Sequence, residues 1–206
     1  MDRHRDVRTA VLALHYQNDT LHPDGVIRVG MNADDSARND VISSARRMLH
    51  VARKMGLPIF HIRIAFREDF ADLVQNCRIF RETAKLGAVV EGSWGAQFHE
   101  GLAPDNARKN EYVLHHLRTS GFIGTPLELL LAKLGVGHLI IAGVATHSVV
   151  EMTARHAADL GYHVTIAADA CAAAEREVHL ASLRTMSLIA EVSTVDAAMA
   201  AAESGE

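Results

Sequence analysis

The sequence predicts a three-layer, Rossmann-like α/β domain, with a parallel sheet of about six strands and helices on both faces. Two observations predict it. Short, apolar, β-branched runs alternate along the chain with longer amphipathic segments, as strands and crossover helices do in parallel sheets. At Gly56, Gly135 and Gly161 an amphipathic segment ends in glycine and an apolar run follows at once. Glycine ends helices because it adopts the left-handed conformation at little cost.

The same patterns place each element in order. The expected strands cover residues 9–15, 58–64, 111–117, 138–143, 163–168 and 190–194. The expected helices cover residues 36–55, 125–134, 148–160, 175–189 and the last residues of the chain. The strand runs are apolar on both faces, which is typical of buried parallel strands.

Helix starts agree with these ranges. Thr125, Pro126 and Glu128 are typical of a cap, a first-turn proline and a capping box. Ser148 and Glu151 form a second capping box, so we expect the Ser148 hydroxyl to cap the helix that follows. Residues 66–110 show no regular pattern, and we expect them to form a lid or an interface between subunits.

Composition limits the class of protein. A chain of 206 residues suits a single domain over 1–206, and a net charge of −4 offers no basic surface for nucleic acid. No apolar stretch is long enough for a membrane span, and the polar N-terminus does not resemble a signal peptide. Cys77 and Cys171 lie far apart, so we expect no disulfide. Because cysteines are few and no signal peptide is recognised, we expect a cytoplasmic location.

The candidate chemistry lies where strands end, because ligands of open α/β sheets bind beyond the carboxyl ends of the strands. His15 and Gln17 follow the first expected strand, and His116 and Arg118 follow the third. Residues 145–149 follow the fourth and lead into a helix. A helix start offers free backbone amides that suit an anion or a developing oxyanion.

Three segments carry a resemblance to isochorismatase-like hydrolases. AVLALHYQNDT (10–20) resembles the family's Asp-x-Gln-Asn-Asp opening, and HLRTSGFIGTPLELLLAKLGV (116–136) its Lys-x-Arg-x-Ser-Ala-Phe segment. LIIAGVATHSVVEMTARHAADLGYHVTIAADAC (139–171) resembles its Gly-Val-Ala-Thr-x-x-Cys block. The resemblance implies the α/β fold above, hydrolase activity, a cis peptide bond before Ala145, and dimers or tetramers. It covers most of the chain, weakly at 66–110.

The chain departs from that family at all three catalytic positions. Catalytic members use aspartate, lysine and a nucleophilic cysteine, and this sequence carries His15, His116 and Val149 there. An isopropyl group cannot attack a carbonyl, so thioester chemistry at residue 149 is excluded. A branch without the cysteine protonates a vinyl ether through the aspartate, but that aspartate is absent here too.

Three hypotheses remain open. In the first, the protein is a hydrolase that cleaves a C–N or vinyl-ether bond of a small anionic substrate without a covalent intermediate. His15 and His116 would then be the acid–base pair, on neighbouring strand ends. No cofactor is expected. The residues expected to contact substrate are Gln17, Arg118, Ala145, Thr146, His147, Val149 and Trp94.

The second hypothesis is a metal site in which His15, His116 and His147 converge and leave a coordination position open for water. The third is a catalytically silent subunit of the same fold that serves in binding or assembly. In the first and third cases we expect a homodimer or homotetramer that binds a small molecule and neither nucleic acid nor membrane.

Overall fold

A computed structural model describes residues 8–205 of the chain, and the N-terminal segment behind the signal-peptide expectation lies outside these residues. One sheet of six parallel strands runs through the described part, in the order β3-β2-β1-β4-β5-β6. The strands are β1 (Arg8–Leu14), β2 (Ile59–Ile64), β3 (Glu111–His116), β4 (Val136–Gly143), β5 (His163–Ala167) and β6 (Glu191–Ser193). The predicted fold class and strand number are confirmed.

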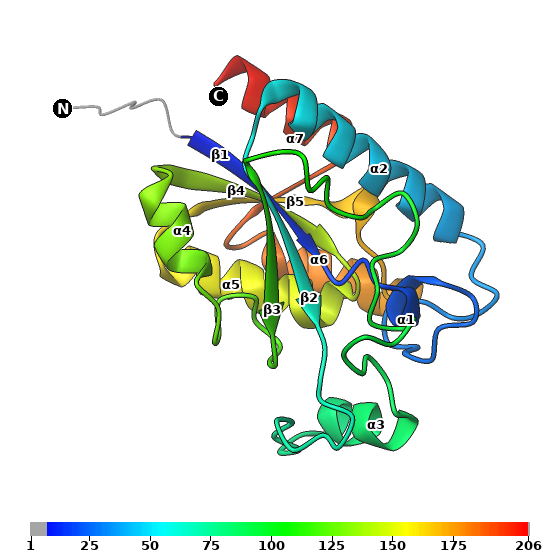
Figure 1. The fold of residues 1–206 in the computed structure, drawn as a ribbon. Coiled ribbons are helices and arrows are strands. Elements are labelled where there is room, and N and C mark those ends of the chain that lie inside the picture. The colour runs from blue at the N-terminus through cyan, green and yellow to red at the C-terminus, as the bar shows by residue number, and fades with distance from the viewer. Residues whose placement is uncertain (1–7, 206) are drawn as a thin grey trace.

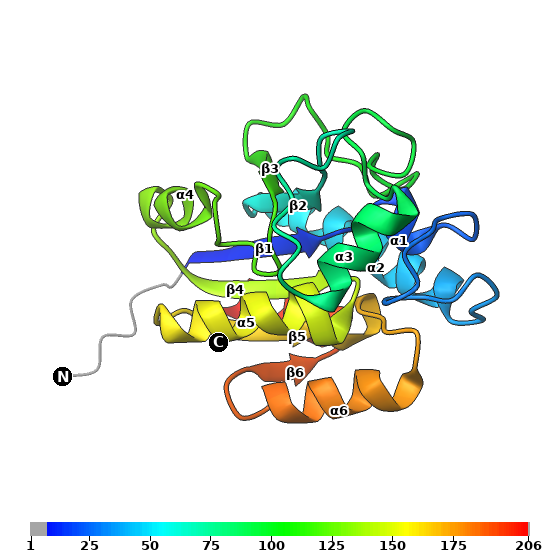
Figure 2. The same cartoon turned by 90° about the horizontal axis from the view of Figure 1, so that it is seen from below.

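Helices cover both faces of the sheet (Figures 1 and 2). Helices α2 and α7 pack together on one face, and α4, α5 and α6 lie on the other. The helices are α1 (Asn18–Leu21), α2 (Arg38–Met55), α3 (Arg78–Leu86), α4 (Leu127–Lys133), α5 (Glu151–Asp159), α6 (Arg176–Met186) and α7 (Val195–Ser204). A π-helical turn, η1 (Thr146–Val150), precedes α5, and a 3₁₀ turn, η2 (Ala168–Ala170), follows β5. Among the described residues, no helix has both the length and the apolar character that crossing a bilayer requires.

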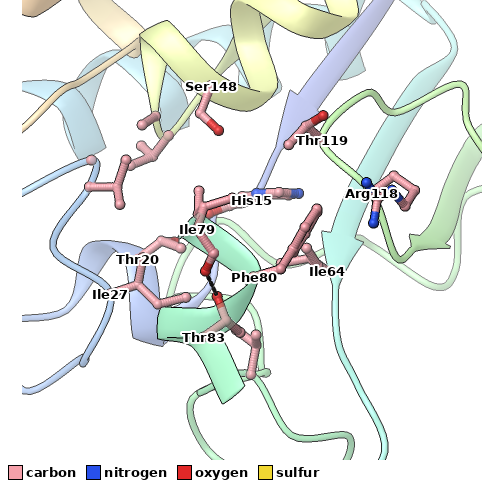
Figure 3. A pocket seen from close by; sticks show the side chains of 15 residues that line it. His15, Thr20, Ile27, Ile64, Ile79, Phe80, Thr83, Arg118, Thr119 and Ser148 are labelled. Atoms are coloured by element: carbon pink, nitrogen blue, oxygen red, sulfur yellow. Dashed lines mark hydrogen bonds between the residues drawn. The ribbon is translucent and has the colours of Figure 1, made fainter. Parts of the chain in front are cut away.

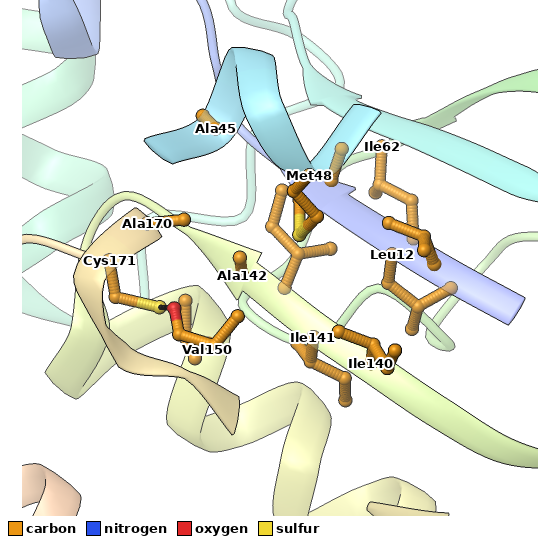
Figure 4. Close-up of a cluster of buried hydrophobic side chains, with 14 of the residues drawn as sticks. Leu12, Ala45, Met48, Ile62, Ile140, Ile141, Ala142, Val150, Ala170 and Cys171 are labelled. Atoms are coloured by element: carbon orange, nitrogen blue, oxygen red, sulfur yellow. Dashed lines mark hydrogen bonds between the residues drawn. The ribbon is translucent and has the colours of Figure 1, made fainter. Parts of the chain in front are cut away.

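The core lies on both sides of the two central strands. Every residue of β1 after Arg8 is buried, as are the last five residues of β4. Figure 4 shows Met48 of α2 over one side of the sheet, with Ala142 of β4 on that side and Ile141 on the opposite side. Burying one such side chain stabilises the fold by about 1.5–3 kcal/mol, so these apolar strands hold the sheet in place. Gly56, Gly135 and Gly161 all have positive φ, as predicted for helix ends.

The strand order reverses between β1 and β4. The chain moves from β1 outward to β2 and β3, then returns to the other side of β1 as β4. Loops that leave β1 and β4 therefore diverge and open a crevice at the carboxyl ends of these strands, where doubly wound folds bind ligands.

Two segments differ from expectation. Residues 66–110 contain helix α3, which lies beyond the carboxyl end of β2 in Figure 1 and has its own apolar cluster around Phe66, Phe80 and Val89. The sequence does not reveal this helix, because its buried residues, Phe80 and Thr83, cover a single helical turn. The helix expected at 148–160 begins instead at Glu151, after the η1 turn.

Candidate active site

Two buried imidazole rings meet at the carboxyl edge of the sheet. The Nε2 atoms of His15 and His116 lie 2.5 Å apart, and the side chains are 8% and 1% exposed. His15 follows β1 and His116 ends β3. We expected these strands to be neighbours, but β2 lies between them. The rings meet across the end of β2 because His116 is level with Ile64 and because His15 has a φ of 55°. This left-handed conformation is uncommon for a residue with a side chain.

The hydrogen bonds define which nitrogen carries each proton. Nδ1 of His116 lies 3.1 Å from the carbonyl oxygen of Ser120, which can only accept, so Nδ1–H donates. Nε2 of a neutral His116 must then accept from Nε2–H of His15. This leaves Nδ1 of His15 with a lone pair, and no described residue hydrogen-bonds to it.

Both imidazoles are neutral at pH 7. Burial lowers the pKa of His15 well below 6.5, and the adjacent His116 lowers it further. Burial also lowers the pKa of His116 to about 4, against the opposing effect of the Ser120 carbonyl. A neutral pair of this kind can accept a proton at His15 without first losing one.

His15 lines a cavity of about 50 Å³ between the strand ends and α3. The lining comes from the segment after β1, the end of β2, helix α3 and the segment after it, the segment after β3, and the turn after β4. In Figure 3, His15 lies among these side chains, with Ser148 and Thr119 on one side and Ile64 and Phe80 on the other. Most of the lining is apolar, so its few polar groups determine what can bind.

Arg118 is the cationic member of the lining. Its guanidinium lies 4.4 Å from the centre of the Phe80 ring and donates to the Val74 carbonyl and to Oδ1 of Asn76. These contacts orient the side chain beside the cavity, as the sequence prediction of a substrate contact requires. Ala145 also lines the cavity, and the peptide bond between Val144 and Ala145 is cis, as the resemblance implied.

The prediction that the Ser148 hydroxyl caps a helix is wrong, because the η1 turn precedes that helix. Ser148 lies inside this turn, it lines the cavity, and its hydroxyl makes no hydrogen bond with the described residues, so it is not a helix cap. The expected free amides are also partly engaged: Thr146 N–H donates to the Ala172 carbonyl, and the amides of Ser148 and Val150 donate to the Ala145 carbonyl.

Five residues expected to contact substrate do not line the cavity. The Gln17 amide is fully buried and hydrogen-bonds the backbone of Ile64 and Ala96, so it joins loops rather than facing a ligand. Trp94 is 46% exposed and packs edge-on against His22, outside the cavity.

The other three lie on η1 but point elsewhere. The Thr146 hydroxyl pairs with Nδ1 of His179 at 2.8 Å, and Val149 is buried in the main core. His147 is exposed to solvent, so it does not converge with His15 and His116 as the metal hypothesis required. Among residues 8–205, no three His, Cys, Asp or Glu side chains are placed to hold a metal ion.

Asp19 holds together the backbone around the site. Its carboxylate accepts from the amides of Val26 and Val89, and it lies so close to Gly95 that a Cβ there would overlap its oxygens. It therefore ties together loops that border the cavity.

Comparisons with known proteins identify the family of this chain. The model of the isochorismatase domain family matches residues 9–197. A probable inactive nicotinamidase of Arabidopsis thaliana is 29% identical, over 86% of this chain and 87% of the relative. A ureidoacrylate amidohydrolase of Caulobacter segnis is 26% identical, over 79% of this chain and 71% of its own length.

A solved structure shows the same fold. The crystal structure of a cysteine hydrolase from Pseudomonas syringae pv. phaseolicola has a TM-score of 0.84 at 22% identity, with 98% of this chain and 95% of that chain covered. The family match over nearly the whole chain and the shared fold lead to one conclusion: this chain belongs to the isochorismatase family.

Proposed function

We propose that this protein is a hydrolase in which a neutral histidine pair activates water, and that it cleaves a C–N or vinyl-ether bond without a covalent intermediate. The observation that carries this proposal is the His15–His116 hydrogen bond, which leaves Nδ1 of His15 unprotonated in a residue that lines the cavity. Water is the nucleophile because Val149 occupies the position of the family's cysteine.

The pair performs the proton transfers. Nδ1 of His15 takes a proton from the attacking water, and the positive charge that forms is shared through Nε2–H with His116. The Ser120 carbonyl, which accepts from Nδ1–H of His116, stabilises that charge. The proton then passes from His15 to the leaving group, so the pair returns to its starting state.

The lining supports a small substrate with an apolar body and one negative charge. Ile27, Ile64, Ile79 and Phe80 would contact the apolar part, and Arg118 would attract a carboxylate. The amidohydrolase among the relatives is named for cleavage of a C–N bond in ureidoacrylate, and the other relative is named as a probable inactive nicotinamidase. We therefore favour an amide or ureido acid over a vinyl ether.

A catalytically silent binding subunit is the second candidate, and it is supported by the relative named as inactive.

In either case we propose a cytoplasmic homodimer or homotetramer with the 66–110 segment at the interface. Both cysteines are unpaired, which suits a reducing compartment.

Ammonia release from small amides and ureido acids, nicotinamide and ureidoacrylate among them, tests the proposal. His15→Ala should abolish turnover, and His50→Ala, a change at an exposed histidine of α2, should leave it intact. Turnover should fall at acid pH with a midpoint below 6.5, because the base must be neutral and its pKa is lowered. Turnover that survives His15→Ala would refute the proposal, and a wild type that hydrolyses nothing would favour the silent subunit.

A further inference from the structure

Four hydroxyl groups line the cavity, and two of them are engaged. Thr20 donates to the carbonyl of His15, and Thr83 donates to the carbonyl of Ile79. The hydroxyls of Thr119 and Ser148 make no hydrogen bond with any described residue. Ser148 and Thr119 therefore have donors available to a bound molecule.

Hydrolysis of an amide needs a donor at the oxygen where negative charge develops. Backbone amides are one source of such donors. The η1 turn engages those of Thr146, Ser148 and Val150 with carbonyl groups, whereas those of Ala145 and His147 make no backbone hydrogen bond within the described residues. The same π-helical turn places Val149 in the core and Ser148 at the cavity. A side-chain donor thus faces the cavity from the same turn as these backbone groups.

We propose that the Ser148 hydroxyl is a catalytic hydrogen-bond donor to the reacting oxygen of the substrate. This inference rests on the proposed function, since it assumes that His15 is the base in the same cavity. Ser148 lies on the β4 side of the cavity and His15 on the β1 side, so a carbonyl group bound between them would be approached from two directions.

For an amide substrate, hydrolysis begins with the attack of water. The water oxygen forms a bond to the carbonyl carbon while its proton passes to Nδ1 of His15. The electron pair of the carbonyl double bond moves to the oxygen, which accepts the hydrogen bond from Ser148. Collapse re-forms the carbonyl and breaks the C–N bond, and the departing nitrogen takes the proton from His15. Amide and water become acid and amine.

Kinetics of Ser148 variants on whichever amide the wild type cleaves test this role. Ser148→Ala should lower kcat roughly 10²–10³-fold, the usual loss of an oxyanion donor, and should change KM little. Ser148→Thr, which keeps the hydroxyl, should recover most of kcat. His147→Ala, a change at the exposed neighbour on the same turn, should leave kcat intact. A kcat for Ser148→Ala within twofold of wild type would overturn the inference while leaving His15 as the base.

Two further measurements separate the alternatives. If a fluorophosphonate labels Ser148, detected by peptide mass spectrometry, the serine is a nucleophile and the donor role is wrong. Calorimetry with methylphosphonate, a tetrahedral oxyanion, needs no turnover: Ser148→Ala should bind it at least tenfold more weakly than wild type. Equal affinity, or no binding to the wild type, would overturn the inference even if the protein proves to be catalytically silent.

Discussion

Acid should destabilise this fold through the buried histidine pair. The folded-state pKa of His116 is about 4, against 6.5 for a solvated histidine. Between these values the unfolded chain binds a proton at this residue and the folded chain does not, so stability falls as the pH falls from 6.5 to 4. Above 6.5 the residue is neutral in both states, and its contribution is complete.

The size of this effect follows from the two pKa values. The interval from 6.5 to about 4, at about 1.4 kcal/mol for each pH unit, corresponds to a loss of about 3 kcal/mol once the pH is below 4. About 2 kcal/mol of this should be lost by pH 5. His15 acts in the same direction, because its pKa is lowered by burial and by His116.

Urea unfolding at pH 7.5 and pH 5 measures the effect. The matched variant is His116→Gln, which keeps a polar group at this position but does not titrate. The other buried histidines, such as His61, are present in both proteins, so they cancel in the difference. The wild type should lose about 2 kcal/mol more than His116→Gln between the two pH values. Equal losses in the two proteins would refute the assignment of this acid sensitivity to the pair.

Three other perturbations test the structure away from the pair. Glu111→Gln should lower stability by about 3 kcal/mol in urea unfolding, because it removes the buried carboxylate that compensates the charges of Arg53 and Arg108. Gly30→Ala should cost about 1–3 kcal/mol and narrow the cavity, because its Cβ would lie 2.0 Å from Cγ1 of Val144; an unchanged melting temperature would contradict this. A thiol reagent at pH 8 should label Cys77 and spare Cys171, whose pKa burial raises to about 12; mass spectrometry of labelled peptides decides it.

The alternation of apolar runs and amphipathic segments determined the fold class, the number of strands and most element ranges. These features are local, because each strand and each helix end carries its own pattern within a few residues. The sequence also determined that no cysteine thioester forms at residue 149, since valine has no nucleophilic atom. Helix α3 was not predicted, because its apolar face is short and packs mainly against loops.

The candidate site could be predicted only in part. His15, His116, Arg118 and Ala145 come together at the strand ends, as their positions after predicted strands suggested. Gln17 follows the same rule in sequence and Trp94 belongs to the irregular segment 66–110, but neither lines the cavity. Which side of a loop a residue faces depends on the contacts that the loop makes, and these are not encoded in spacing.

Only the tertiary structure decided how the chemical groups are arranged. His15 and His116 are separated by a whole strand in the sheet, and their contact depends on strand register and on the left-handed backbone of His15. Ser148 reaches the cavity because the turn after β4 is π-helical, so the following side chains are rotated relative to an ordinary helix. The residues of that turn carry an ordinary capping pattern, while in the folded chain the turn contacts β4 and α6 and donates a hydrogen bond to the Ala172 carbonyl.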